Sequence, residues 1–315
     1  MSKDTDAQFD GQPCTQVLTI VEVALNGPWG KARQPLAPIA VADIVADGVA
    51  CARAGAAVVH VHPYDERSGR QNDDLETYVK IIEGIREQAD VLVYPSAPFV
   101  DNDDIDRYGV TERLAERGLI QWATVDPGSL NIARYDDIAQ SRPGFVYRNS
   151  ETALKDALAM ASRLGIVPSY ACYEPGHIRL GAALHAMHVH APTPVYRLML
   201  SDEFTFGFPP RAFALEAYAA LFSELDLKVP VMVAGLGVDI THLIPDIVQR
   251  GWHIRVGLED AVFGCPSSNV ELVRNAVESV HRVGGRVANA RDILQGSVPQ
   301  LQVRPRAPAA GLRTR

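Results

Sequence analysis

The chain has 315 residues, of which 47% are hydrophobic and 22% are charged, and its formal net charge is −8. This composition supplies enough apolar side chains for a sizeable core and excludes an intrinsically disordered chain. The sequence pI is near 5.6, and no basic stripe is interleaved with aromatic residues, so nucleic acid is not expected as a partner.

Targeting and membrane-spanning segments are not expected either. The N-terminal stretch MSKDTD is polar and lacks the apolar run of a signal peptide, and no window approaches the ~20 apolar residues of a membrane span. We therefore expect a cytoplasmic protein with no membrane partner. The cysteines Cys14, Cys51, Cys172 and Cys265 lack CxxC spacing, so we interpret them as reduced and not as a zinc knuckle, redox pair or disulfide framework.

Short runs rich in β-branched residues alternate with amphipathic segments. Strands are predicted, in chain order, over 17–24, 56–62, 90–95, 120–126, 166–173, 194–200, 229–235 and 253–258. Helices are predicted over 42–54, 74–88, 103–117, 150–164, 177–189, 211–224, 240–250 and 268–283. Eight βα units predict a single-domain α/β protein, a closed (β/α)8 TIM barrel over 17–296, with a loose N-terminal segment over 1–16 and a tail over 297–315.

An open doubly wound sheet has the same local pattern and is the competing fold. Its dinucleotide fingerprint would have to begin at the Gly-Leu-Gly of 235–237, but that turn follows the seventh predicted strand and lacks the third glycine. The tail, with Arg-Pro-Arg-Ala-Pro at 304–308, is expected to be non-helical, to bury little, and to be either mobile or laid across a neighbouring subunit.

His60 and His62 end the second predicted strand. Side chains at i and i+2 point to the same side of a strand, so both imidazoles converge on one point, as metal ligands do. A pair of hydrogen-bonded core histidines, or an exposed edge strand, would give the same pattern. The position at the C-terminal end of a strand favours a metal, because ligand sites of barrels lie there. Glu259, at the end of the eighth strand, is the candidate third ligand.

The same eighth strand predicts a second functional pair. Alternation places Arg255 on the side of Glu259, where a guanidinium needs a partner, and Asp260 is the nearest acceptor. An Arg255–Asp260 dyad therefore follows, as a source of acid–base chemistry or as an ion pair that closes one end of the barrel.

Hydroxyl and amide side chains follow two other strands. Ser96 follows the third strand, and Ser129 and Asn131 lie in the turn after the fourth. They are candidate donors to a substrate carboxylate or thioester oxygen, although turn formation explains them equally well. No Gly-x-Ser-x-Gly context is present, which excludes a serine hydrolase.

Four further histidines lie on or just after one predicted helix and have no His-Glu-x-x-His pattern. We interpret them as solvated helix positions; they are His177, His185, His188 and His190.

Together these motifs resemble the β-keto acid cleavage enzymes, the family named for the 3-keto-5-aminohexanoate cleavage enzyme of lysine fermentation. The blocks that carry the resemblance follow family order over nearly the whole chain. They are AGAAVVHVH at 54–62 with Asp65 and Gly69-Arg70 after it, Pro95-Ser96, VDPGSLN at 125–131, and RVGLED at 255–260 with Ser268-Asn269.

The resemblance implies a (β/α)8 barrel and a zinc ion held by His60, His62 and Glu259. It also implies the reaction: a β-keto acid and acetyl-CoA, the co-substrate, give acetoacetate and a new acyl-CoA. The Arg255–Asp260 pair would supply the base, with Ser96, Ser129 and Asn131 as substrate-binding residues. A homo-oligomer, either a dimer or a tetramer, is implied as well.

Three positions depart from the family pattern. Tyr64 stands where the family commonly has an arginine, and Ala97-Pro98 replaces a Gly-rich turn. In the first loop, the aminohexanoate enzyme has an acidic residue that receives the substrate ammonium, whereas this chain has Asn-Gly-Pro before Trp29. We therefore expect Trp29 to line the substrate site and to favour a neutral or apolar substrate tail.

Two other functions fit the same residues. A metal-dependent hydrolase or aldolase on the same barrel would use the same ligands without CoA, and a non-catalytic binding barrel would keep the two histidines as structural residues. Acetyl-CoA dependence separates the first alternative from a cleavage enzyme, and metal content separates the second.

Overall fold

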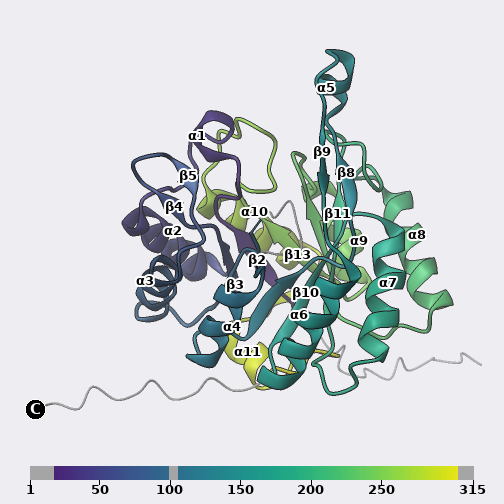
Figure 1. Ribbon diagram of the computed structural model, residues 1–315. Coiled ribbons are helices and arrows are strands. Elements are labelled where there is room, and N and C mark those ends of the chain that lie inside the picture. Colours follow the sequence, from purple (N-terminus) through teal and green to yellow (C-terminus); the bar gives the residue numbers. More distant parts are fainter. Residues whose placement is uncertain (1–17, 99–105, 304–315) are drawn as a thin grey trace, which may run out of the picture.

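The computed structural model describes residues 18–98 and 106–303, and its central feature is a sheet of eight parallel strands wound nearly into a closed barrel (Figure 1). The sheet order is β6-β3-β2-β13-β12-β11-β10-β7. The strands are β2 (Val21–Ala24), β3 (Val58–Val61), β6 (Leu92–Pro95), β7 (Trp122–Val125), β10 (Val167–Cys172), β11 (Val195–Leu200), β12 (Val231–Gly235) and β13 (His253–Val256). All eight lie within the predicted ranges.

The strand pairing decides between the two folds that the sequence allowed. The first barrel strand, β2, pairs in parallel with the last, β13, which the 3-2-1-4-5-6 order of a doubly wound sheet does not permit. The order ends at β6 and β7, and across this seam the Thr124 hydroxyl donates a hydrogen bond to the Pro95 carbonyl at 3.0 Å. The single-domain (β/α)8 barrel is therefore confirmed.

Helices surround the strands and present their apolar faces to them (Figure 1). Those predicted from the sequence are α2 (Val41–Ala54), α3 (Leu75–Arg86), α4 (Gly109–Glu116), α6 (Glu151–Leu164), α7 (Pro175–Ala186), α8 (Ala212–Glu224), the 3₁₀ turn η1 (Thr241–Leu243) with α9 (Ile244–Gln249), and α10 (Asn269–Arg282). Ser268 and Glu271 form a capping box at the start of α10. Among the described residues, no helix has both the length and the apolarity needed to cross a membrane.

Short elements close the bottom of the barrel, of which β1 lies within the first predicted strand and β14 and α11 were not predicted. Strand β1 (Leu18–Thr19) pairs with β14 (Arg286–Val287), and α11 (Ala290–Leu294) follows. Val298 and Leu301 are each only 1% exposed and pack in a cluster with residues such as Ile20 and Met232. The expectation that the tail beyond 297 buries little is therefore wrong for its first residues, because the open bottom of a barrel needs apolar cover. The segment 1–16 and the tail beyond 303 lie outside the described residues.

At the opposite end the chain forms insertions around the strand ends. They are α1 (Gly30–Arg33), the hairpin of β4 (Tyr64–Asp65) and β5 (Arg70–Gln71), and an arm made of β8 (Leu130–Ile132), α5 (Tyr135–Ala139) and β9 (Phe145–Tyr147). The arm projects well beyond the barrel (Figure 1). Arg134, between β8 and α5, is joined to the loop after β11 by a bridge to Phe204.

The turn after β13 provides a test of the barrel's packing. Gly257 has a φ of +135°, and a Cβ built on it would lie 2.1 Å from the Ala24 carbonyl oxygen of β2. Gly257→Ala should lower the free energy of unfolding by more than about 3 kcal/mol, because the backbone clash adds to an outlier conformation that costs about 1–3 kcal/mol. Urea unfolding curves measure the change.

The control is Gly284→Ala. Its φ is +80°, but nothing lies within 4 Å of a Cβ built there, so only the cost of the left-handed conformation, about 1–2 kcal/mol, is expected. Equal losses in the two variants would show that the close approach of β13 to β2 is unimportant for stability.

Candidate active site

His60 lies in β3 and His62 directly follows it, and both rings are buried at the C-terminal end of the strand. Asn26, in the loop after β2, fixes this strand end. Its side-chain amide donates to the His62 carbonyl at 2.8 Å and to the Pro38 carbonyl at 2.9 Å, and its Oδ1 accepts from the His62 backbone N–H at 3.0 Å. The backbone that carries the histidines is thus held from the neighbouring loop.

Glu259 reaches the histidines from the other side of β2. Its backbone N–H donates to the Ala24 carbonyl at 3.2 Å, and its side chain lies directly over Gly27, where a Cβ would come within 2.6 Å of the Glu259 Cγ. Gly27 is therefore required for this approach. The glutamate Oε2 lies 3.5 Å from His60 Nε2 and 3.4 Å from His62 Nε2, and the two nitrogens are 3.2 Å apart.

These three side chains form the group of potential metal ligands found among the described residues. Glu259 Oε2 has no hydrogen-bond partner in that part of the chain, although it is buried. Three donor atoms that converge in this way, with one left unsatisfied, fit a metal site. The His62 Nδ1 lies 2.9 Å from the Oε1 atom of Gln71, in β5. Because this oxygen is an acceptor, it favours the tautomer with the proton on Nδ1, and the lone pair of Nε2 is then free to bind a metal.

The ionisation of the three groups also suits a metal. Burial lowers the pKa of His60 well below its usual value, so its ring is neutral. Burial also acts to lower the pKa of His62, but Glu259, together with Gln71 and Asp73, raises that pKa overall. Burial disfavours the charge on Glu259, but Arg255 and the two histidines hold its pKa well below the usual range. The site therefore contains a carboxylate and at least one neutral imidazole.

The predicted Arg255–Asp260 pair is formed and is bidentate. Arg255 Nε donates to Asp260 Oδ2 at 2.7 Å, and its Nη2 donates to Asp260 Oδ1 at 3.0 Å. The guanidinium also lies 2.7 Å from Glu259 Oε1 and 3.3 Å from Glu22 Oε1. Burial raises the pKa of Asp260 to about 6 although Arg255 acts to lower it.

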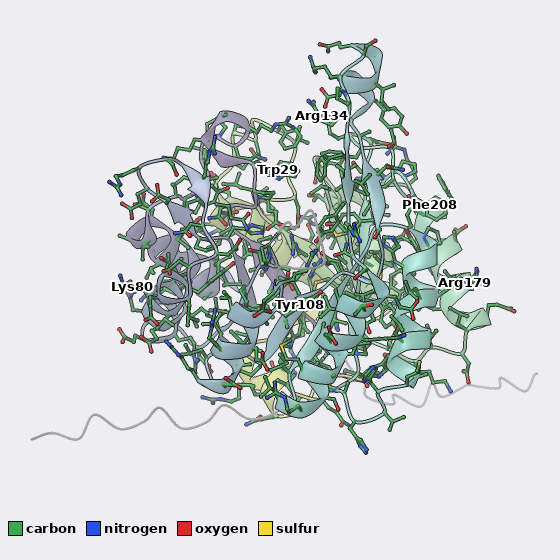
Figure 2. All side chains as sticks on the ribbon, viewed as in Figure 1. Trp29, Lys80, Tyr108, Arg134, Arg179 and Phe208 are labelled. Carbon is green, nitrogen blue, oxygen red and sulfur yellow. The ribbon has the colours of Figure 1, made fainter. Side chains whose placement is uncertain are left out.

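A cavity of about 420 Å³ opens at this end of the barrel, over the three candidate metal ligands and Arg255. Trp29 forms part of its wall, donates from Nε1 to the Glu259 carbonyl at 2.8 Å, and packs against Phe204 and Phe263. Figure 2 shows Trp29 at the same end of the barrel as the projecting arm, on which Arg134 is labelled. A larger hollow, of about 1040 Å³, lies around Trp252 at the opposite end of the strands, away from these groups.

The remaining predicted site residues divide between the cavity and its surroundings. Ser96 lines the cavity, and its Oγ lies 2.7 Å from the Tyr78 hydroxyl. Ser129 and Asn131 are exposed and are not part of the cavity lining; the Ser129 hydroxyl instead bonds to the backbone of Asn149. Asp260 borders a separate hollow of about 310 Å³, so the cavity reaches Arg255 and not Asp260.

The interpretation of His177 as a solvated position is wrong. Its side chain is buried at the start of α7 and lies over Gly128, where a Cβ would come within 2.4 Å of the ring. The reason is that α7 begins directly after β10 and packs its first turn onto the turn that follows β7. His185 and His188 are partly exposed and His190 is exposed. Of the cysteines, Cys51 and Cys172 are buried and free, Cys265 is free and partly exposed, and Cys14 lies outside the described residues.

The sequence motifs gave no role to three charged residues of the barrel interior. Glu22 accepts from the Tyr94 hydroxyl at 2.6 Å, and Arg197 donates to the Tyr94 hydroxyl at 2.9 Å and to Ser169 Oγ at 2.7 Å. Arg197 and Asp126 line the cavity. A signal did exist, because a charge inside an apolar strand, such as Glu22 between two valines, must be paired or functional.

Comparison with known proteins supports the resemblance seen in the sequence. The model of the beta-keto acid cleavage enzyme family matches residues 19–295. The 3-dehydrocarnitine:acetyl-CoA trimethylamine transferase of Rhizobium meliloti (strain 1021) is 26% identical over 277 residues, covering 81% of this chain and 88% of that protein. The 3-keto-5-aminohexanoate cleavage enzyme of Fusobacterium nucleatum subsp. nucleatum is 26% identical over 273 residues, covering 84% and 92%.

A third relative is the 3-oxoadipate:acetyl-CoA acetyltransferase of Cupriavidus necator, 24% identical over 317 residues and covering 94% of this chain and 99% of that protein. Among solved structures, ObcA in complex with oxaloacetate has a TM-score of 0.64 at 17% identity and covers 85% of this chain and 68% of that chain. At that identity the likeness concerns the fold. The family model spans nearly the whole barrel, and the chain therefore belongs to the beta-keto acid cleavage enzyme family.

Proposed function

We propose that this protein is a zinc-dependent enzyme that converts a β-keto acid and acetyl-CoA into acetoacetate and a new acyl-CoA. The observation that carries the proposal is the joint position of His60, His62, Glu259 and Arg255 at one cavity of a chain of this family, with Asp260 bound to Arg255 behind it. The names of two relatives specify acetyl-CoA as a reactant, which supports the choice of co-substrate. We also propose a homo-oligomer, a dimer or tetramer, as the family resemblance implies.

Zinc fits the spacing of the ligand atoms. In a tetrahedral site with Zn–N distances of about 2.0–2.1 Å, two ligand nitrogens lie about 3.3 Å apart, close to the 3.2 Å between the histidine Nε2 atoms. Two histidines and one carboxylate leave a position open, as in catalytic zinc sites. When bound there, zinc would act as a Lewis acid on the substrate keto group.

The Arg255–Asp260 dyad is proposed to take the proton that starts the carbon–carbon bond chemistry. Burial acts to lower the pKa of Arg255, but the carboxylates of Asp260 and Glu259 raise it well above its usual value, so the guanidinium stays protonated and Asp260 is the member of the dyad that would accept the proton. Arg255 lines the cavity and Asp260 does not, so Arg255 would position both the substrate and Asp260. The pKa of about 6 makes Asp260 an acceptor near neutral pH. The positive charge of Arg255 would also attract the carboxylate of the substrate in the cavity.

The reaction itself is tested by acetoacetate formation from a panel of β-keto acids, with and without acetyl-CoA. Acetoacetate should form only when acetyl-CoA is present. Turnover of a β-keto acid without acetyl-CoA would instead identify a hydrolase or aldolase.

Removing one histidine tests the ligand assignment. His60→Ala should lose both bound zinc and acetoacetate formation, because two remaining ligands cannot hold the ion at a catalytic site. Metal analysis by plasma mass spectrometry on the purified variant measures the first effect. His281→Ala, on the exposed face of α10, is the matched control and should keep one zinc per chain. A His60→Ala protein with full zinc content would show that the ligand set is different.

Asp260→Asn tests the base. The variant should keep zinc and its fold, since the side chain is nearly isosteric, but lose roughly 10²–10⁴-fold in turnover. The carboxylate accepts a proton only in its ionised form, so kcat/KM of the unmodified enzyme should rise with pH through about 6. That rise should be absent from the variant's pH profile. Near-normal turnover would make Asp260 a structural partner of Arg255.

The third test concerns the substrate tail. Trp29 offers an aromatic face where an ammonium would need a carboxylate, and a cation–π contact is worth only ~0.5–2 kcal/mol. In a competition assay, β-keto acids with neutral tails should show higher kcat/KM than 5-amino-3-ketohexanoate, and Trp29→Glu should shift the preference toward the amine.

Trp29→Phe is the control for this shift, because it keeps an aromatic ring but cannot donate to the Glu259 carbonyl. It should retain the preference for neutral tails. A clear preference of the unmodified enzyme for the aminated acid would contradict the assignment.

A further inference from the structure

Two insertions at the active-site end of the barrel carry four positive side chains that the proposed reaction does not use. Lys31 and Arg33 lie on α1, and Arg67 and Arg70 lie on the β4–β5 hairpin. We call these four residues the α1–hairpin patch. All four are exposed, and in the described part of the chain none of their charged groups forms an ion pair or donates a hydrogen bond. Unpaired cations of this kind, in a chain whose formal net charge is −8, indicate a surface for an anionic ligand.

The two insertions are in contact with each other. Figure 1 shows α1 beside β5, and the Tyr64 hydroxyl at the base of the hairpin accepts from the Gly30 N–H at 3.2 Å. A Cβ built on Gly30 would lie 3.8 Å from the Gly69 carbonyl oxygen. Lys31 and Arg70 directly follow these two glycines, so the backbone positions of one cation from the helix and one from the hairpin are close together.

The patch lies at the rim of the cavity and not inside it. Trp29, which lines the cavity, directly precedes α1, and the Arg33 guanidinium lies 5.9 Å from the centroid of its ring. In the hairpin, Gln71 turns inward to His62, and because successive side chains of a strand point to opposite faces, Arg70 points away from the cavity. A ligand on the patch would therefore reach the reacting groups only through a part that extends over the rim.

The carboxylates of the same two insertions do not neutralise the patch. Asp65 Oδ1 accepts from the Ser68 N–H at 2.7 Å, and Glu66 Oε1 accepts from the Val41 N–H at 3.1 Å. On α1 and the hairpin, four cations and two carboxylates leave an excess of two positive charges.

The arm on the other side of the cavity mouth has no such excess. Its carboxylates pair with its own arginines, Asp137 with Arg142 at 2.5 Å and Asp136 with Arg134 at 3.9 Å. Arg134 pairs in addition with Glu203 of the loop after β11. The excess positive charge around the mouth therefore lies on α1 and the hairpin.

These features fit the shape and the charge of acetyl-CoA. In this molecule a long, uncharged pantetheine arm separates the acetyl thioester from a diphosphate and a 3′-phosphate, which are strongly anionic. Lysine and arginine are the usual partners of phosphate groups. The cavity itself contains the carboxylates of Glu259 and Asp126, so the phosphates are better placed outside it while the thioester enters.

From these observations we propose that the α1–hairpin patch binds the phosphate groups of acetyl-CoA, so that the pantetheine arm crosses the rim beside Trp29 and brings the thioester into the cavity. The inference deepens the proposed function and rests on it for the identity of the co-substrate. It assigns a binding site for the nucleotide end of that co-substrate.

The test measures binding without turnover. Isothermal calorimetry with the zinc-loaded protein, in the absence of a β-keto acid, compares acetyl-CoA with S-acetylpantetheine, which has the same thioester and no phosphate. Acetyl-CoA should bind roughly 10- to 100-fold more tightly, the range for several exposed charge pairs. Added salt should reduce this difference, because it screens exposed charges.

Lys31→Ala/Arg70→Ala should weaken acetyl-CoA binding roughly 5- to 30-fold, because two exposed charge pairs are lost. The affinity for S-acetylpantetheine should stay within about twofold, which shows that the cavity of the variant is intact. Lys228→Ala/Arg286→Ala, at the opposite end of the barrel, removes the same charge and is the matched control. Its affinity for acetyl-CoA should stay within about twofold of that of the unmodified protein.

The outcomes separate this inference from the proposed function. Equal affinities of the unmodified protein for the two thioesters, unchanged acetyl-CoA affinity in Lys31→Ala/Arg70→Ala, or an equal loss in the control variant would each overturn the assignment of the patch. Adding β-keto acids then tests the reaction independently. Patch-dependent binding of acetyl-CoA without acetoacetate from any acid would keep the assignment and refute the proposed function. Acetoacetate formation with an unchanged KM for acetyl-CoA in Lys31→Ala/Arg70→Ala would do the reverse.

Discussion

The buried guanidinium of Arg255 is the group on which the site depends. It lies within 2.7–3.3 Å of carboxylate oxygens from Glu22, Glu259 and Asp260, although only 2% of the arginine is exposed. A buried charge is tolerated only when it is paired and hydrogen-bonded, so these contacts fix one another's positions. The guanidinium thus holds Glu259, the candidate third metal ligand, and Asp260, the proposed proton acceptor, at the same time.

The charge balance of this network explains why a cation suits it. Arg255 and Arg197 carry two positive charges, and Glu22, Glu259 and Asp260 carry three negative charges when ionised, which leaves one negative charge in excess. This excess negative charge lies beside the ring of His60, which is neutral because burial holds its pKa low. Cation binding would relieve this imbalance.

The barrel divides the cavity into two walls. The candidate metal ligands and the Arg255–Asp260 pair lie in or directly after β3 and β13, on either side of β2. The wall formed by β7, β11 and the arm carries Asp126, Arg197 and apolar side chains.

The sequence by itself determined the eight barrel strands, the convergence of His60 and His62, and the pairing of Arg255 with Asp260. These features follow from local rules: side chains alternate along a strand, and a guanidinium takes the nearest carboxylate. The choice of Glu259 as the third ligand needed one further assumption, that the barrel closes and brings the last strand beside the first.

Only the tertiary structure decided the remaining contacts. Glu22 meets the Tyr94 hydroxyl 72 positions away, Gln71 reaches His62 from a hairpin, and Asp126 faces the cavity because α4 and the arm bring Arg107 and Tyr147 to its other side. Likewise, Ser129 bonds to the backbone of Asn149, outside the cavity lining. Such contacts join segments whose relative positions depend on loop paths, and loop paths are set by the packing of the whole barrel, which no local pattern encodes.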